Sequence, residues 1–106
     1  MLLTTHNERL FQLGQVVCTA GVSAWGAMGA NAVAIDLCLK RHTSGDWGEI
    51  DPADAEMNDK GVSGDDRLHS SYPKQGAKKG VYEGKTIWII TEQDRSATTI
   101  LFPEEY

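Results

Sequence analysis

The stretch KTIWIITEQDRSATTILFP, residues 85–103, decides the fold of this 106-residue chain. In residues 85–91 both alternating faces are apolar or β-branched, which is typical of a central strand. The polar residues 92–96 turn the chain, residues 97–102 return it, and Pro103 cannot donate a hydrogen bond to a neighbouring strand. The stretch therefore predicts an antiparallel hairpin at the centre of a sheet.

Two further strands are predicted upstream of this hairpin. Residues 67–72 alternate between polar and apolar side chains, and Pro73 is expected to end that strand. Residues 15–18 form a short β-like run near the N-terminus, after a segment, residues 1–12, that we expect to be a flexible leader. Residues 73–84 are rich in glycine and lysine and predict a long loop.

Helical patterns fill the middle of the chain. Thr19 and Asn31 are both residue types that cap a helix start, and residues 32–42 after Asn31 carry the strongest helical periodicity. Asp51 and Pro52 are typical of the beginning of a third helix. The apolar residues that share one face of the strongest helix are Val33, Ala34, Leu37 and Cys38.

Together these patterns predict one α+β domain, residues 13–106. An N-terminal short strand and two to three helices are expected to pack on a C-terminal three-stranded antiparallel sheet, arranged as a meander. The hydrophobic fraction of 41% and the charged fraction of 24% are ordinary for a globular protein.

The chain lacks the features of exported or membrane proteins. No window holds the roughly 18 consecutive apolar residues of a membrane span, and the N-terminal residues do not resemble a secretory signal. We therefore expect a cytoplasmic protein that does not contact membranes. Cys18 and Cys38, the two cysteines, lie in apolar sequence and are expected to be buried thiols, with a disulfide between them as the alternative.

Charge is distributed unevenly along the chain, whose formal net charge is −5. Residues 46–66 hold eight acids and one base, and residues 67–85 hold five bases and one acid. The acidic segment has two interpretations: a solvated helix face, or a surface that mimics a nucleic-acid backbone and docks on a basic groove of another protein. The net charge argues against general binding of nucleic acid or anionic membranes.

Three blocks of sequence resemble a family of short, uncharacterised plasmid- and phage-related proteins whose members are often labelled as a type I restriction modification subunit. The blocks are LGQVV (13–17), RHTSGDWGE (41–49) and WIITEQDRSATTILFPEEY (88–106). One departure is TAG at residues 19–21, where the family usually has Thr-Pro-Gly. The resemblance implies a mobile element in a bacterial host cell, and it implies no activity.

The most chemical-looking local cluster combines His42 with Asp46 and Glu49. A histidine and two carboxylates bind metals or share protons, but a metal site needs three or four ligands and no second ligand pair is visible. The favoured interpretation is structural: His42 ends a helix, Asp46 satisfies backbone donors, and Trp47 fills the core beside a turn that needs Gly48. We therefore predict no metal, no cofactor and no catalytic residues.

The leading functional hypothesis is a non-enzymatic mobile-element accessory protein that binds a partner protein. An inhibitor of a bacterial defence system, of the anti-CRISPR or anti-restriction type, would use the acidic surface for this. In this hypothesis Arg95, in the hairpin turn, binds an anion or a carboxylate of the partner. The structural alternative is that Arg95 belongs to a charged turn and pairs with a surface acid. The predicted partner contacts are Asp46, Glu49, Asp51, Asp54, Asp59 and Arg95.

Two other hypotheses remain open. A small nucleic-acid-binding or regulatory protein would use the lysine-rich loop, residues 73–85, with tyrosines for stacking; its contacts are Lys74, Lys78, Lys79 and Lys85. A small enzyme centred on His42 and Asp46 is weaker. A homodimer is also open, because a central strand that is apolar on both faces needs cover on each.

Overall fold

The computed structural model describes residues 9–64, 66–75 and 85–106. In chain order the elements are β1 (Gln15–Cys18), α1 (Ala20–Trp25), α2 (Gly29–Thr43), α3 (Pro52–Gly61), β2 (Leu68–Gln75), β3 (Lys85–Thr91), β4 (Ala97–Leu101) and the 3₁₀ turn η1 (Pro103–Glu105). The predicted α+β class is confirmed, and so are the strand over residues 15–18, the hairpin and the helix that begins at Pro52.

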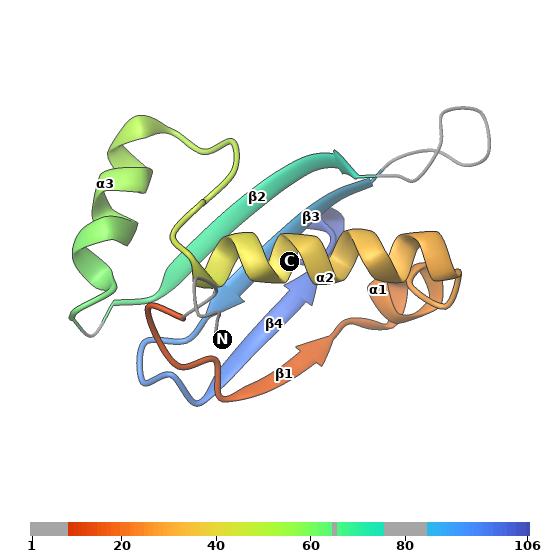
Figure 1. The fold of residues 1–106 in the computed structure, drawn as a ribbon, viewed down its shortest axis with the longest axis horizontal. Coiled ribbons are helices and arrows are strands. Elements are labelled where there is room, and N and C mark those ends of the chain that lie inside the picture. The colour runs from red at the N-terminus through yellow and green to blue at the C-terminus, as the bar shows by residue number, and fades with distance from the viewer. Residues whose placement is uncertain (1–8, 65, 76–84) are drawn as a thin grey trace, which may run out of the picture.

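The sheet has four strands in the order β1-β4-β3-β2, which corrects the predicted three-stranded meander. The antiparallel meander β2-β3-β4 is present, but β1 joins it beside β4 as a parallel strand, with Val16 opposite Thr98. A parallel neighbour requires a long crossover connection, and the chain from α1 to β3 supplies it. Figure 1 shows β1 along one edge of the sheet and β2 along the other.

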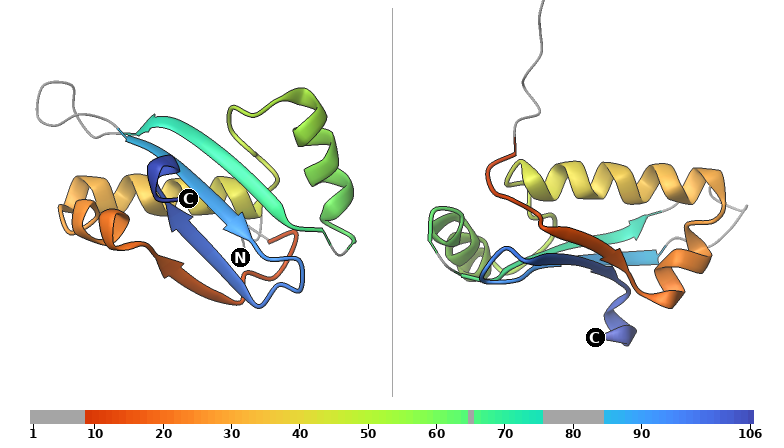
Figure 2. Two further views of the ribbon diagram at one scale, coloured as in Figure 1. Left: turned by 180° about the vertical axis from the view of Figure 1, so that it is seen from behind. Right: turned by 90° about the horizontal axis from the view of Figure 1, so that it is seen from below.

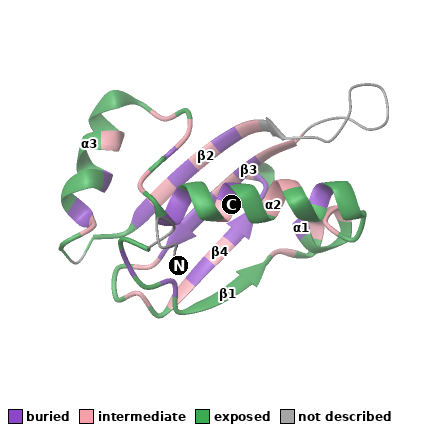
Figure 3. Cartoon of the chain, in the orientation of Figure 1, coloured by how far each residue is buried: buried purple, intermediate pink, exposed green. Residues whose placement is uncertain are grey.

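Helix α2 covers one face of the sheet, and η1 lies beyond the opposite face (Figure 2, right). The core under α2 joins the inward residues of the strands to Val22 and Cys38, and all of them are buried (Figure 3). We call this the covered face, and the other the open face. The strand residues of this core are Tyr72, Ile87, Ile89 and Ile100.

The buried side of α2 differs from the predicted one. The helix begins at Gly29, and Asn31 is buried, with its side-chain amide donating to the carbonyl of Trp25 at 2.8 Å. Val33 and Leu37, which were predicted to share a face with the buried Cys38, are 59% and 54% exposed. The apolar residues of this helix lie on more than one side, so the periodicity alone could not select the side that meets the sheet.

Strand β2 continues past the predicted stop at Pro73 and reaches Gln75. Its register against β3 shifts between Tyr72 and Gln75. Because β2 is an edge strand, a residue without an N–H is tolerated there, whereas a central strand would lose a ladder hydrogen bond.

A chain of buried polar groups joins α2 to three strands on the covered face. His42 Nδ1 lies 2.5 Å from Ser70 Oγ, and His42 Nε2 lies 2.9 Å from Thr91 Oγ1. Thr91 Oγ1 lies 2.8 Å from Thr98 Oγ1, which donates to the carbonyl of Leu13 at 2.8 Å. All four side chains are buried, and each is satisfied within the chain, as most buried polar groups are.

The segment before β1 packs on the core in its described part. Phe11 and Leu13 are 7% and 2% exposed, and the backbone N–H of Leu10 donates to the carbonyl of Thr43 at 2.9 Å. The packed chain therefore begins before residue 13; residues 1–8 of the predicted leader lie outside the described residues.

Both cysteines are free thiols, but only Cys38 is buried. Cys18 is exposed in β1, which corrects the expectation that it is buried. Burial raises the pKa of Cys38 to about 11, so it acts as a small hydrophobe. Among the described helices, none is long and apolar enough to cross a membrane.

Candidate partner-binding cleft

A cleft of about 400 Å³ opens on the outer side of β2, between this strand and α3. It brings together side chains from the segment before α3, from α3 itself, and from the open face of β2 and β3. We call it the α3–β2 cleft, and its lining is Glu49, Ile50, Asp51, Asp54, Met57, Asn58, Arg67, His69, Ser71 and Trp88.

The first wall is held to β2 by backbone pairing around Gly48. The N–H of Glu49 donates to the carbonyl of Ser71 at 2.8 Å, and the N–H of Ser71 donates to the carbonyl of Trp47 at 3.0 Å. Gly48 has a φ of +76°, and a Cβ at this position would collide with the carbonyl of Ser71. The pairing carries Glu49 to the cleft and closes part of the outer edge of β2. The predicted need for glycine at this turn is confirmed.

Helix α3 forms the second wall, and Asn58 attaches it to the sheet. Its side-chain Nδ2 donates to the carbonyl of His69 at 2.8 Å, and its Oδ1 accepts from the N–H of His69 at 3.3 Å. The amide thus replaces the neighbouring strand that β2 lacks. Because the first turn of α3 starts at Pro52 after Asp51, Asp51 and Asp54 reach the mouth of the cleft on the same side as the buried Asn58.

A row of aromatic rings forms the floor of the cleft and continues across the open face. His69 and Trp88 meet edge to face with ring centroids 4.5 Å apart, and Trp88 meets Tyr106 at 5.6 Å. Arg67 Nη2 donates to the hydroxyl of Tyr106 at 3.0 Å, and its guanidinium lies 5.5 Å from the centroid of the same ring. Trp88 therefore contacts neighbouring rings on the open face and also lines the cleft.

His69 is a polar residue of the floor, and one of its ring nitrogens is unsatisfied among the described residues. Its Nε2 is buried and has no hydrogen-bond partner among the described residues. Burial lowers the pKa of His69, the positive charge of Arg67 lowers it further, and Asp54 opposes both. The ring is therefore neutral at pH 7 and adds no positive charge to the cleft.

The charge of the lining is predominantly negative. Glu49, Asp51 and Asp54 contribute three exposed carboxylates, and Arg67 contributes the one guanidinium. Carboxylates beside an indole ring are the groups that bind an arginine or lysine side chain, through charge-assisted hydrogen bonds and cation–π contact. Within the described residues, no three His, Cys, Asp or Glu side chains form a group suited to a metal ion.

The structure separates the six predicted contact residues into two groups. Three of them, Glu49, Asp51 and Asp54, line the cleft. The other three, Asp46, Asp59 and Arg95, make contacts within the chain. Their roles as partner contacts stay predictions, and each of the three has a role in the fold.

Asp46 and Asp59 support the first wall. Asp46 accepts hydrogen bonds from Arg41 Nε at 2.7 Å and Nη2 at 3.2 Å and from the N–H of Gly48 at 3.2 Å. The hydrogen bond from Arg41 is the main reason that the pKa of Asp46 is lowered. Asp59 Oδ1 accepts from Nε1 of the buried Trp47 at 2.9 Å. His42 and Asp46 therefore have separate partners, as the structural interpretation of this cluster predicted.

Arg95 ties the hairpin turn to the connection between α3 and β2. It adopts a φ of +61°, and its guanidinium donates to five backbone carbonyls. The shortest of these bonds reach the carbonyls of Asp66 and Gly61, both at 2.6 Å. The remaining acceptors are the carbonyls of Glu92, Gln93 and Gly64.

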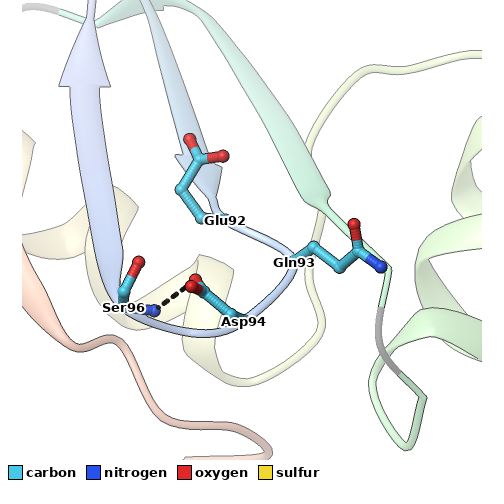
Figure 4. Close-up of a pocket in the computed structure, with 4 residues that line it drawn as sticks. All are labelled: Glu92, Gln93, Asp94 and Ser96. Atoms are coloured by element: carbon cyan, nitrogen blue, oxygen red, sulfur yellow. Dashed lines mark hydrogen bonds between the residues drawn. The ribbon is translucent and has the colours of Figure 1, made fainter.

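A second hollow, of about 490 Å³, lies beside the hairpin turn and is lined by Glu92, Gln93, Asp94 and Ser96 (Figure 4). All four residues belong to one turn. The carboxylate of Asp94 accepts from the N–H of Ser96 at 3.0 Å, and hydrogen bonds to Ser96 lower the pKa of Asp94. A single exposed turn does not assemble groups from separate elements, so the α3–β2 cleft is the better candidate.

The residues of the nucleic-acid hypothesis are described only in part. Lys85 Nζ lies 5.6 Å from the centroid of the Phe102 ring. Lys78 and Lys79 lie outside the described residues, as does the side chain of Lys74.

Sequence reasoning missed the cleft residues that come from the sheet. His69, Ser71 and Trp88 alternate with buried core residues, and that alternation was the available signal. It shows that they share a face, but not that α3 stands beside this face.

Comparison with known proteins gives no relative: no family model matches the chain, and no curated protein or solved structure is significantly similar to it.

Proposed function

We propose that this protein is a non-enzymatic binding protein of a phage or plasmid, and that it docks on a basic surface of a partner protein through the α3–β2 cleft. A host defence complex of the restriction or CRISPR type, which carries basic grooves for nucleic acid, is the proposed partner. The mobile-element setting comes from the family resemblance of residues 13–17, 41–49 and 88–106.

One observation carries the proposal: three carboxylates from two adjoining segments surround a cleft with an indole on its floor. Glu49 and Asp51 come from the segment that pairs with β2, and Asp54 comes from the first turn of α3. None of the three takes part in the internal hydrogen bonds that occupy Asp46 and Asp59. No ion pair within the described residues neutralises them, which supports a role for their charge in binding a partner.

A basic side chain would enter the cleft over Trp88, with its positive charge among the carboxylates. A guanidinium has five N–H donors, enough to reach more than one of these carboxylates together. The wider negative charge of the protein speeds the encounter with a basic partner and makes the association rate sensitive to salt.

Charge reversal tests the proposal. The triple variant Glu49→Lys, Asp51→Lys, Asp54→Lys is compared with wild type for binding to purified restriction and CRISPR effector complexes at 50 and 200 mM salt. We expect the variant to bind at least about a hundredfold more weakly, because each lost contact between opposite charges is worth about 1–2 kcal/mol or more. The salt dependence of the association rate should fall as well.

Glu56→Lys is the matched control, since Glu56 is exposed on the same helix but is not part of the cleft lining. It should bind as wild type does. Equal binding by wild type and the triple variant would overturn the proposal. Binding of wild type to DNA or RNA in a low-salt gel shift, lost in the double variant Lys78→Glu, Lys79→Glu, would favour the nucleic-acid hypothesis instead.

A further inference from the structure

The two edge strands of the sheet, β2 and β1, differ in how far their outer backbone groups are hydrogen-bonded within the described residues. Along β2, the outer edge is paired with Trp47 and Glu49 at Ser71, and with the Asn58 amide at His69. Along β1, every residue from Gln15 to Cys18 is exposed, and β4 is the one strand that pairs with it among the described residues. Figure 2 (right) shows β1 in front of the sheet, and no described segment crosses it.

The free edge of β1 offers hydrogen-bonding groups at defined positions. The N–H groups of Gln15 and Thr19 donate to the carbonyls of Ser96 and Ile100 in and beside β4, both at 3.0 Å. Because backbone groups alternate in direction along a strand, Val16 and Cys18 point their N–H and C=O groups outward. An unpaired row of this kind is a template for another strand.

The side chains of this edge are apolar on both faces. Val16 pairs with Thr98 and shares its orientation toward the covered face, whereas Val17 pairs with Thr99 and lies on the open face. Val16 and Val17 are 42% and 38% exposed. The strand has no lysine, proline or inward-pointing charge, which are the features that protect edge strands in monomers.

We propose that β1 is a dimerisation edge, on which β1 of a second copy of this chain pairs in the antiparallel sense and extends the sheet across a two-fold axis. A charged partner would be recognised through charges along the edge, and residues 15–19 have none. In a chain of net charge −5, an uncharged strand is also the segment where two identical copies meet without repulsion.

The two-fold axis restricts the register. An axis perpendicular to the sheet keeps each face on its own side and places one residue opposite its own copy. At the middle of this four-residue strand, that residue is Val16 or Val17. Centring on Val17 pairs Val16 of each chain with Cys18 of the other and uses all the outward groups of both residues. Centring on Val16 would instead pair Cys18 with Gly14, which leaves the extended conformation with a φ of +64°. The Val17 register is therefore the favoured one.

Cysteine cross-linking tests this register directly. At the centre of the dimer, the two Val17 residues form a non-hydrogen-bonded pair with Cα atoms about 4.5 Å apart, within the range of about 4.4–6.8 Å that a disulfide spans. The variant Val17→Cys, Cys18→Ser should give a covalent dimer on mild oxidation. The control Val16→Cys, Cys18→Ser should stay uncross-linked, since its thiols would lie on Cα atoms about 8 Å apart.

Sedimentation measures the association without a cross-link. Val16→Pro removes an outward N–H and keeps every N–H that donates to β4, so it should keep the circular dichroism spectrum of wild type and dimerise at least about tenfold more weakly. Val17→Lys should do the same by placing two charges at the axis. A wild-type chain that stays monomeric at millimolar concentration overturns the proposal, and so does cross-linking through position 16 in place of 17.

Discussion

The two faces of the sheet differ in how their buried polar groups are hydrogen-bonded, and the histidines His42 and His69 show the difference. On the covered face, both ring nitrogens of His42 contact hydroxyls of Ser70 and Thr91, and the ring is fully buried. On the open face, Nε2 of His69 is buried without a hydrogen-bond partner among the described residues, and the residue lines the α3–β2 cleft. Adjacent residues of β2 thus contribute to the core on one face and to the lining of the cleft on the other.

This contrast separates polar groups that stabilise the fold from polar groups that are candidates for binding another molecule. Polar groups that are satisfied within the chain contribute to folding, and their loss acts on the whole structure. Polar and charged groups that the chain leaves without an internal partner are available for a second molecule.

The largest expected effect is from His42→Ala. The substitution leaves a cavity in the core and removes a partner from two buried hydroxyls, so it should lower the free energy of unfolding by about 3–5 kcal/mol. His69→Ala, on the open face, should cost about 1 kcal/mol or less, because it removes no described hydrogen bond of its ring. Urea unfolding measures both, and equal losses would refute the contrast between the faces.

Gly48→Ala should cause the next largest loss in the free energy of unfolding. It adds a Cβ at a φ of +76° and forces it against the carbonyl of Ser71, so we expect a loss of about 2–4 kcal/mol. The same variant displaces Glu49 and should weaken partner binding. Gly29→Ala is the control: a Cβ there meets nothing within 4 Å, so the change in stability should be favourable and below about 1 kcal/mol.

The stability of the protein should fall as the pH is lowered below 6.5. Burial lowers the pKa of His42 to about 3, whereas the unfolded chain protonates this residue near 6.5. Between these values the unfolded state binds more protons, so stability is lost with falling pH, with a slope of up to about 1.4 kcal/mol per unit.

Urea unfolding at several pH values between 6.5 and 5 measures this slope. His42→Gln should abolish most of it. His69→Gln should remove a smaller part, since the pKa of the partly buried His69 is lowered in the same direction. A slope that survives in His42→Gln would assign the pH dependence to other groups.

The smallest expected effect belongs to the open face. Tyr106→Phe removes the hydroxyl that accepts from Arg67, but Tyr106 is 69% exposed and water replaces the bond. The free energy of unfolding should change by less than about 0.5 kcal/mol. Thermal unfolding measures this, and a loss comparable to that of Gly48→Ala would show that the aromatic row is part of the core.

The sequence was sufficient to predict an element wherever its local pattern was compatible with one kind of structure. Residues 85–91 are apolar on both faces and form the central strand, and Asp51 with Pro52 begins a helix because a fixed φ and a missing N–H suit its first turn. The sequence also located the acidic segment that contains Glu49, Asp51 and Asp54. These features depend on neighbours along the chain.

Only the tertiary structure decided the features that depend on distant partners. It chose the buried side of α2, gave β1 a parallel place beside β4, and directed Arg95 to carbonyls about thirty residues away. It also divided the acids predicted as partner contacts into two that bond within the chain, Asp46 and Asp59, and three that line the α3–β2 cleft. The reason is physical: alternation and helical periodicity specify which side chains share a face, whereas the energy of packing two distant faces together specifies which faces meet.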